Sequence, residues 1–375
     1  MRRLGHKRAL FKCVARSFRD FKLTQRHGGS INPQICYFPA MPRIDRDQLI
    51  LRLDALFLAE GVPPRRARRL AERYTQASAD GVYSHGVHMV PGLLRLLRAK
   101  EIADTRSDPR LVARSGAIER YDGHCGLGVL NAEFCIDRAM SLADAFGIGC
   151  VALRNTRHWG RPGNCGWRAA QRGFLAICWT NTPPNMPAWP DTGENAIGNN
   201  PIVFAAPGKD GAHLVLDMAM SQFSFGRMET HRAEGKPLPV IGGVDASGHP
   251  TTDAAAILDR GHPWPIGFWK GTGLAILLDV FAAIMADGRD TANLKPGGGD
   301  PHVSQVFLAI QPSHLGGRGA AQRTDEILSV YAAQNPAARY PGEAALASRR
   351  QSEIDGVYVR DDVWTQLVDW QVDRP

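Results

Sequence analysis

Residues 82–88 read Val-Tyr-Ser-His-Gly-Val-His, and they follow a segment with a helical pattern. The stretch places Ser84 and His85 side by side, next to a glycine that lets a ligand approach the backbone. A histidine here can give or take a proton near neutral pH, a contribution typically worth about 10²–10⁴-fold in rate. We therefore predict that His85 is the proton donor and acceptor of a redox enzyme. The alternative is a structural histidine that is hydrogen-bonded within a loop.

The residues on either side of this stretch are predicted to be helical. Asp45 with Gln48 three positions later has the form of a capping box, and leucines then recur on one face. Two prolines open a second helix over residues 64–79. Leucines between 93 and 97 indicate a further helix. The first part of the body is therefore helical.

From about residue 116 the pattern is that of an α/β region. Segments rich in β-forming residues alternate with helical patterns. The expected strands cover 148–153, 174–180, 213–218 and 304–311, and the expected helices cover 130–145 and 162–172. Residues 234–266 hold many glycines and prolines without periodicity, which predicts a long loop system. An apolar helix over 274–286 is too short to span a membrane, so burial in the protein is expected.

The positive charge of the chain lies in its first forty residues. Residues 1–40 hold nine Lys or Arg residues and one acid, whereas residues 41–375 hold 36 of each sign. A neutral body indicates no nucleic-acid surface. The basic segment fits an arm for an anionic surface, an organelle transit peptide, or an extension upstream of the true start at Met41. We favour the last interpretation, in which residues 1–40 are disordered or are not part of the native protein. A transit peptide is the second choice.

The seven cysteines indicate a reducing compartment. Their number is odd, they contain no C-x-x-C pair, and several lie in apolar segments. Such thiols behave as small buried hydrophobes. We predict a cytoplasmic protein without disulfides and without a metal site.

Several familiar fingerprints are missing from the sequence. It has no G-x-G-x-x-G after a strand, no P-loop, no H-E-x-x-H and no G-x-S-x-G. An ordinary Rossmann enzyme is therefore disfavoured, although a nicotinamide enzyme of another fold remains open.

Two other stretches offer ligand contacts. Lys270-Gly271-Thr272-Gly273 stands before the apolar helix, where free N–H groups and a lysine can bind an anion, and Trp269 beside it can pack on a ring. The segment 213–219 is a strand that ends on Asp217, a position where α/β proteins place ligands or a histidine partner. Each has a structural alternative: residues 270–273 could be a glycine-rich helix start that binds nothing, Trp269 could be buried in the core, and Asp217 could form a turn.

His158 and Asn181 complete the set of candidate residues. His158 lies in Arg-His-Trp-Gly, and Asn181 lies with Asn199 and Asn200 in proline-rich loops. These residues could flank a site or simply form well-made turns.

The order of these motifs resembles the malate/L-lactate dehydrogenase family of the non-Rossmann type. The resemblance starts near Met41 and runs to the C-terminus, so it leaves the basic segment out. It is carried by G-V-Y-S-H-G-V (81–87), G-I-G-C-V-A-L-R-N (147–155), C-W-T-N (178–181), N-P-I-V (200–203), D-M-A-M-S-Q-F-S-F-G (217–226), L-P-V-I-G-G (238–243), W-K-G-T-G (269–273) and P-G-E (341–343).

This resemblance implies a fold and a reaction. The expected fold is α/β, with a mixed-sheet, non-Rossmann nicotinamide-binding domain (116–274) and a helical domain (41–115, completed by 275–375). The expected protein is a homodimer that binds a small keto or hydroxy acid. The expected cofactor is NADH or NADPH, held by His213, Leu214, Val215, Leu216, Asp217, Met218, Ala219, Trp269, Lys270, Gly342 and Glu343.

The implied activity is reduction of a 2-keto acid, for which we expect a sugar-derived 2,3-diketo acid. His85 is the family's proton donor, and Ser84, His158, Asn181 and Asp217 are expected to orient it or to bind substrate. A hydroxy-acid dehydrogenase or a cyclic imine acid reductase on the same scaffold is the alternative. An alternative of another class is a binding protein for small anions without catalytic activity.

One residue departs from the family's pattern. Members commonly carry an arginine shortly after S-H-G that grips the substrate carboxylate, and here Met89 occupies that position. A methionine cannot pair with a carboxylate. Arg157, Arg161 or His88 is expected to replace it.

Overall fold

The first helices of the body form where the sequence predicts them. The computed structural model describes residues 43–190, 193–296, 299–316 and 319–370. The Asp45 carboxylate accepts hydrogen bonds from the N–H groups of Asp47 and Gln48, which confirms the predicted cap. The helices and 3₁₀ turns of this part are α2 (Arg46–Ala59), α3 (Pro64–Ala79), η2 (Tyr83–His85), η3 (Val87–Met89) and α4 (Val90–Arg98).

Both ends of the body share one hydrophobic core. Strand β1 (Arg43–Ile44) pairs antiparallel with β12 (Val357–Tyr358), and α12 (Asp361–Val368) follows. Leu49 and Phe57 lie in one buried cluster with Leu367. The N- and C-terminal parts of the body therefore pack together, whereas the predicted domain boundaries stay a prediction. The predictions for residues 1–40 fall outside the described residues.

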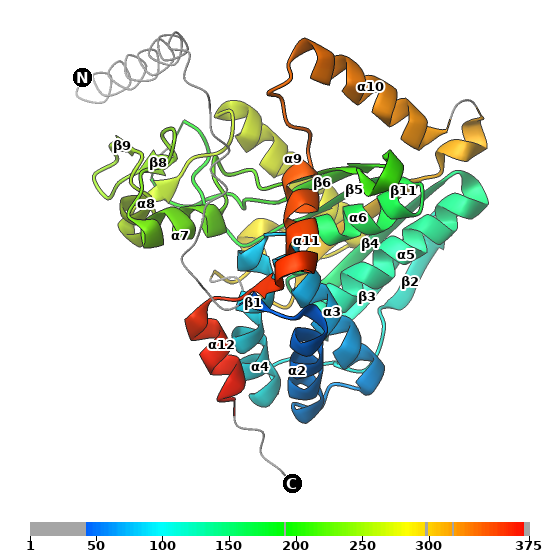
Figure 1. Ribbon diagram of the computed structural model, residues 1–375, viewed down its shortest axis with the longest axis horizontal. Helices are drawn as coiled ribbons and strands as arrows, with labels where there is room; N and C mark the ends of the chain where they lie inside the picture. The colour runs from blue at the N-terminus through cyan, green and yellow to red at the C-terminus, as the bar shows by residue number, and fades with distance from the viewer. Residues whose placement is uncertain (1–42, 191–192, 297–298, 317–318, 371–375) are drawn as a thin grey trace. The chain divides into compact units, whose positions relative to one another are not determined.

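A mixed seven-stranded sheet lies at the centre of the body (Figure 1). Its order is β2-β3-β4-β11-β5-β6-β7, in which β3 and β4 pair in parallel and the other neighbours pair antiparallel. The strands are β2 (Arg110–Ser115), β3 (Ile118–Gly126), β4 (Ile148–Thr156), β5 (Leu175–Thr180), β6 (Ile202–Ala206), β7 (Leu214–Met218) and β11 (Val303–Ile310). This confirms the predicted mixed sheet. Strand β11 comes from the stretch expected to complete the helical domain, yet it pairs at the centre of the sheet.

Helices cover both faces of this sheet (Figure 1). Helices α5 (Gly128–Phe146) and α6 (Gly163–Gln171) pack on one face, and α9 (Trp269–Ala286) packs on the other. Val151 and Leu153 of β4 join the core with α5, whereas Ala152 between them joins the core with α9. Because successive side chains point to opposite faces, a strand covered on both sides is apolar throughout.

Residues 234–266 are not the long loop that the sequence predicted. They contain a small antiparallel sheet, in the order β10-β8-β9, and a helix, and they follow α7. The elements are α7 (Phe225–Glu234), β8 (Gly243–Val244), β9 (Pro250–Thr251), α8 (Ala254–Arg260) and β10 (His262–Pro263). The prediction was wrong because strands of two residues carry no alternation for a sequence pattern to show.

Helix α9 begins at Trp269, earlier than the predicted residue 274. Gly271 and Thr272, predicted to precede the helix, are buried in its first turn. Among the described helices, α9 is the one long and apolar enough to cross a membrane, with 18 residues and a mean hydropathy of 1.5. It packs on the sheet with 33% of its residues buried, so its outer face is apolar and exposed.

The remaining elements lie mostly near the C-terminus. Helix α11 packs on α3, where Ser352 Oγ donates to the carbonyl of Ala79. Helix α10 has no buried residue. These elements are η4 (Lys209–Gly211), η5 (Thr291–Asn293), η6 (Pro312–Leu315), α10 (Ala320–Gln334) and α11 (Glu343–Asp355). The five cysteines in the described residues are free thiols.

Candidate active site

The turn that carries His85 is fixed by its packing on α3. Gly86 approaches Ser78 so closely that a Cβ atom would stand 2.2 Å from Ser78 Oγ. Ser78 Oγ also accepts the N–H of Val87 at 2.9 Å. Ser84 Oγ lies 2.9 Å from His85 Nδ1. This bond holds one ring nitrogen of His85 and leaves Nε2 for proton transfer.

His158 lies against His85. The two ring centroids are 5.5 Å apart, with an interplanar angle of 28°. The N–H of Gly160 donates to His158 Nδ1 at 3.1 Å, so the neutral ring carries its proton on Nε2. Burial lowers the pKa of His158 to about 3. The ring therefore stays neutral and is suited to donating a hydrogen bond.

Asp217 is the third polar residue of this group. It lies near the end of β7, and its Oδ2 accepts the N–H of Gly163, the first residue of α6, at 2.8 Å. Its charge acts on His85, so the two side chains are within electrostatic range. The fold thus brings Ser84 and His85, His158, and Asp217 together from three separate segments.

The electrostatics of this group suit proton transfer. Burial lowers the pKa of His85; Asp217 opposes this effect and Arg161 adds to it. Burial raises the pKa of Asp217, against the positive charge of Arg161 and the N–H of Gly163. The two pKa values are therefore shifted toward each other.

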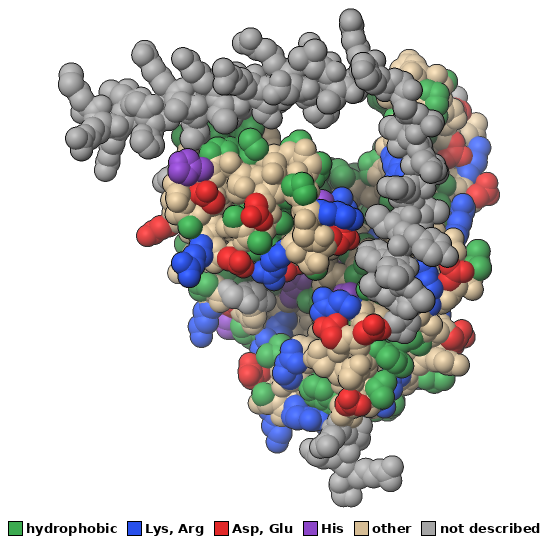
Figure 2. Space-filling model, turned by 60° about the vertical axis from the view of Figure 1, so that its left-hand side comes forward, with side chains coloured by type: hydrophobic (Ala, Val, Ile, Leu, Met, Phe, Trp, Pro, Cys, Tyr) green, Lys and Arg blue, Asp and Glu red, His purple; other side chains and the backbone are tan. Residues whose placement is uncertain are grey.

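These four side chains are not sealed in a core, and we call the surface that they form the cleft. Ser84, His158 and Asp217 keep accessible surface and His85 is half-buried, although the surrounding protein shifts the pKa values of the three titratable groups. Figure 2 shows that His side chains and Lys or Arg side chains gather where the visible face is hollowed. Groups that are desolvated yet reachable are typical of a binding site.

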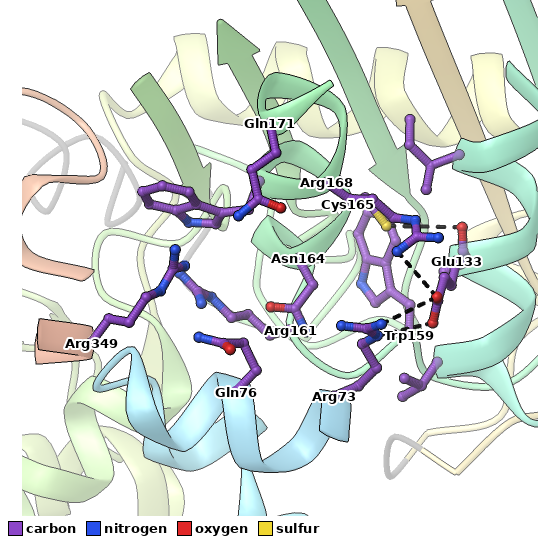
Figure 3. A pocket seen from close by; sticks show the side chains of 14 residues that line it. Arg73, Gln76, Glu133, Trp159, Arg161, Asn164, Cys165, Arg168, Gln171 and Arg349 are labelled. Atoms are coloured by element: carbon purple, nitrogen blue, oxygen red, sulfur yellow. Dashed lines mark hydrogen bonds and ion pairs between the residues drawn. The ribbon is translucent and has the colours of Figure 1, made fainter. Parts of the chain in front are cut away.

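A buried charge cluster contains Arg161, the arginine whose charge acts on His85. Arg161 and Arg349 of α11 both donate to the carboxylate of Asp80, with Arg349 at 2.8 Å (Figure 3 shows their guanidinium groups close together). Burial disfavours the charge on Asp80, but the two arginines outweigh it and lower its pKa. We did not predict Asp80 or Arg349, because positions 80, 161 and 349 share no local sequence pattern.

The C-terminal loop lies along the open edge of β7. The N–H of Val215 donates to the carbonyl of Pro341 at 2.9 Å. Gly342 has a φ of 102°, and a Cβ there would stand 2.9 Å from the carbonyl oxygen of His213, so glycine is required. The structure therefore places Gly342 and Glu343 beside the predicted cofactor strand, which comprises His213, Leu214, Val215, Leu216, Asp217, Met218 and Ala219.

The start of α9 lies close to the end of the same strand. The N–H of Ile266 donates to the carbonyl of Met220 at 2.7 Å. Trp269 is 68% exposed, and Lys270 Nζ lies 5.9 Å from the centre of its ring. An exposed indole, a lysine at a helix N-terminus and a strand edge fit a dinucleotide. These residues can hold a nicotinamide cofactor by stacking and by charge.

Asn181 is not part of this group. Its amide nitrogen donates to Asp279 and to the carbonyl of Arg289, and its oxygen accepts the N–H of Ser304. The side chain is fully buried. These bonds join β5 to α9 and β11, and a role in binding substrate stays a prediction.

Met89 lines an apolar cavity of about 440 Å³ that reaches His158. Most of its walls come from α3, α4 and the start of α5. Arg157 also lines it, and the Nε of Arg157 is buried without a partner among the described residues. Of the three expected replacements for the missing arginine, Arg157 and His88 lie in this cavity and Arg161 does not.

Comparisons with known proteins identify the family of this chain. Residues 44–368 match the family model described as malate/L-lactate dehydrogenase. The 2,3-diketo-L-gulonate reductase of Citrobacter koseri is 37% identical over 333 residues, which cover 87% of this chain and 99% of that protein. The sulfolactate dehydrogenase of Methanocaldococcus jannaschii has a similar structure, with a TM-score of 0.79 and 27% identity over 87% of this chain and 95% of that one.

A reductase structure is also similar. The delta1-piperideine-2-carboxylate reductase of Pseudomonas syringae gives a TM-score of 0.77 and 27% identity, covering 88% of this chain and all of that one. The eight motifs that carried the resemblance thus lie in a chain that matches the family over nearly all of its described length. The chain belongs to the malate/L-lactate dehydrogenase family, and it is an oxidoreductase of hydroxy or keto acids that uses a nicotinamide cofactor.

Proposed function

We propose that this chain reduces the 2-keto group of a small keto acid to a hydroxyl group, and that His85 supplies the proton. The nicotinamide cofactor, when bound, supplies the hydride that adds to the carbonyl carbon. The proton on His85 passes to the carbonyl oxygen, so that the two transfers complete the alcohol. The observation that carries the proposal is the convergence of His85, His158 and Asp217 in one accessible cleft.

The neighbouring residues have separate roles in this proposal. The Nε2–H of neutral His158 donates to the carbonyl oxygen and stabilises the charge that develops there. Ser84 orients the ring of His85. Asp217 favours the protonated form of His85 and can return its proton.

For the substrate we propose 2,3-diketo-L-gulonate, reduced to 3-dehydro-L-gulonate. The support is the name of the Citrobacter koseri relative and its near-complete coverage. Arg157 is proposed to hold the carboxylate, because it lines the apolar cavity together with His158 and its Nε has no partner among the described residues. The Pseudomonas syringae structure makes a cyclic imine acid the second substrate to examine.

The test is a spectrophotometric assay of NADH and NADPH oxidation with a panel of acids. The panel contains 2,3-diketo-L-gulonate, pyruvate, oxaloacetate, sulfopyruvate and delta1-piperideine-2-carboxylate. Turnover with at least one keto acid and one of the two cofactors is expected. If both cofactors bind and no acid in the panel is turned over, the chain is a binding protein and the proposal is wrong.

We also propose that the enzyme is a cytoplasmic homodimer. The outer face of α9 exposes Leu277, Phe281 and Ile284, and large exposed apolar faces mark protein interfaces. Light scattering after gel filtration is expected to give a dimer, and Phe281→Arg is expected to give a monomer. Leu315→Arg, at an exposed leucine of η6, is the matched control. A wild-type monomer would contradict this assembly.

A further inference from the structure

A second cavity, of about 110 Å³, lies between helices α3, α5, α6 and α11 (Figure 3). It is separate from the apolar cavity beside Met89, but Arg161 connects it with the cleft, because this residue lines the cavity and acts on His85. In Figure 3 the side-chain amides of Gln76, Asn164 and Gln171 point into the same space as the guanidinium groups of Arg161 and Arg349.

The lining contains buried donors without partners. Trp159 Nε1, Trp167 Nε1 and Arg161 Nε have no hydrogen-bond partner among the described residues. All three side chains are nine-tenths or more buried. Buried N–H groups are nearly always paired in native proteins, so unpaired donors on three residues that line one cavity point to an acceptor beside them.

The same cavity has an excess of positive charge. Its lining holds four arginines, Arg73, Arg161, Arg168 and Arg349, and one carboxylate, Glu133. Glu133 is engaged by Arg69, Arg73 and Arg168. Outside the lining, Asp80 pairs with Arg161 and Arg349, and Asp137 pairs with Arg168 and Arg172. Even with Asp217 near Arg161 included, the six arginines outnumber the four acids, although residues 41–375 are neutral as a whole.

We propose that this cavity binds one tetrahedral oxyanion of the phosphate class. Guanidinium and indole N–H groups are donors only, and planar guanidinium forks match phosphate oxygens. The cavity volume of about 110 Å³ is large enough for one phosphate group. Glu133 is a repulsive element in the lining, but its charge is neutralised by three arginines.

A bound oxyanion changes the catalytic cleft through Arg161. His85 contacts Ser84 and His158, and the charges of Asp217 and Arg161 act on it. The positive charge of Arg161 lowers the pKa of His85, so an anion beside Arg161 offsets that effect and favours the protonated ring. Reduction then proceeds faster at neutral pH. This consequence rests on the proposed function, whereas the binding site does not.

Binding is tested by calorimetry with the full chain and inorganic phosphate, against chloride at equal ionic strength. The wild type is expected to bind phosphate and sulfate but not chloride. Arg168→Gln is expected to weaken binding about tenfold to a hundredfold, as is typical for a lost charge-assisted hydrogen bond. Arg172→Gln is the matched control, because Arg172 pairs with the same Asp137 but does not line the cavity. It is expected to leave binding unchanged.

A second variant and a second ligand test the proposed phosphate site further. Gln171→Leu places an apolar group at the exposed rim without breaking an ion pair, and it is expected to weaken binding in a chain that folds normally. A phosphorylated sugar acid that binds better than free phosphate would identify a metabolite as the source of the anion. No heat with phosphate in the wild type, or equal losses in Arg168→Gln and Arg172→Gln, would overturn the site.

The link to the cleft is tested by the pH profile of keto-acid reduction with and without phosphate. Phosphate is expected to shift the limb that reports His85 toward higher pH, and Arg168→Gln is expected to remove that shift. Phosphate that binds without moving the profile would overturn the link through Arg161 alone. Absence of any turnover would overturn the proposed function, while calorimetry still decides the site.

Discussion

Asn181 and Asp217 are both polar residues at the ends of strands, and the fold uses them in opposite ways. Asn181, after β5, is buried and makes three hydrogen bonds within the protein. Asp217, near the end of β7, is accessible and accepts one bond from Gly163. A side chain whose hydrogen-bonding capacity is used within the protein has little left for a ligand. Unused capacity in an accessible place, and not residue type, distinguishes the cleft from the scaffold.

The largest effect is expected on the cleft side of this comparison. His85→Asn leaves a polar side chain at this position but removes the group that can donate a proton. We expect turnover to fall about 10²–10⁴-fold, the usual contribution of general acid catalysis. Steady-state kinetics with the best keto acid of the panel measures this loss.

The same variant should leave two other properties unchanged. Dinucleotide affinity, measured by fluorescence titration, is expected to stay near that of the wild type, because the proposed cofactor residues lie in other segments. Unfolding in urea is expected at the same midpoint, because His85 is only half-buried. Near-normal turnover in a folded variant would show that His85 is the structural histidine of the alternative interpretation.

The scaffold side should respond in the opposite manner. Asn181→Ala leaves Ser304 N–H and part of Asp279 without a partner, at about 1–3 kcal/mol for each buried group. We expect a lower midpoint in urea and nearly unchanged kcat per folded molecule. Asn335→Ala, at the exposed end of α10, is the control and should unfold like the wild type. A large loss of kcat with an unchanged midpoint in urea would show that Asn181 acts in the active site.

The sequence predicts the features that depend on local patterns, and it does not predict contacts between residues that are far apart in the chain. Helix α3 and the Asp45 cap were predicted residue by residue, because periodicity and capping are local. His85 and Asp217 could be singled out because each has a local motif. The bond between Asp80 and Arg349 joins residues 269 positions apart and has no local sign. The proposed oxyanion cavity was missed for the same reason, since its lining comes from four helices.

Met89 allows a smaller test of the cleft. Met89→Arg places a second cation in the cavity with Arg157, and we expect the KM for a keto acid to fall about tenfold with little change in kcat. Met89→Leu, similar in volume, is expected to leave the KM unchanged. Arg157→Gln should raise the KM, and the double variant with Met89→Arg should recover it in part. An unchanged KM in Arg157→Gln would show that another residue holds the carboxylate.

The smallest effect is expected in the pH dependence of stability. Burial lowers the pKa of His88 from 6.5 to about 4, and the N–H of Arg360 donates to His88 Nε2 at 3.4 Å. Between pH 6.5 and 4, His88 is therefore protonated in the unfolded chain and neutral in the folded chain. The free energy of unfolding falls as the pH falls through this window, and above the window His88 does not affect it. One histidine contributes at most about 1.4 kcal/mol per pH unit. In urea unfolding between pH 7 and 4.5, His88→Gln should flatten this slope, whereas His249→Gln, at an exposed turn, should keep it. If the free energy of unfolding depends on pH equally in the wild type and in His88→Gln, another group takes up the proton on unfolding. His158 would be the next residue to test, because burial also lowers its pKa.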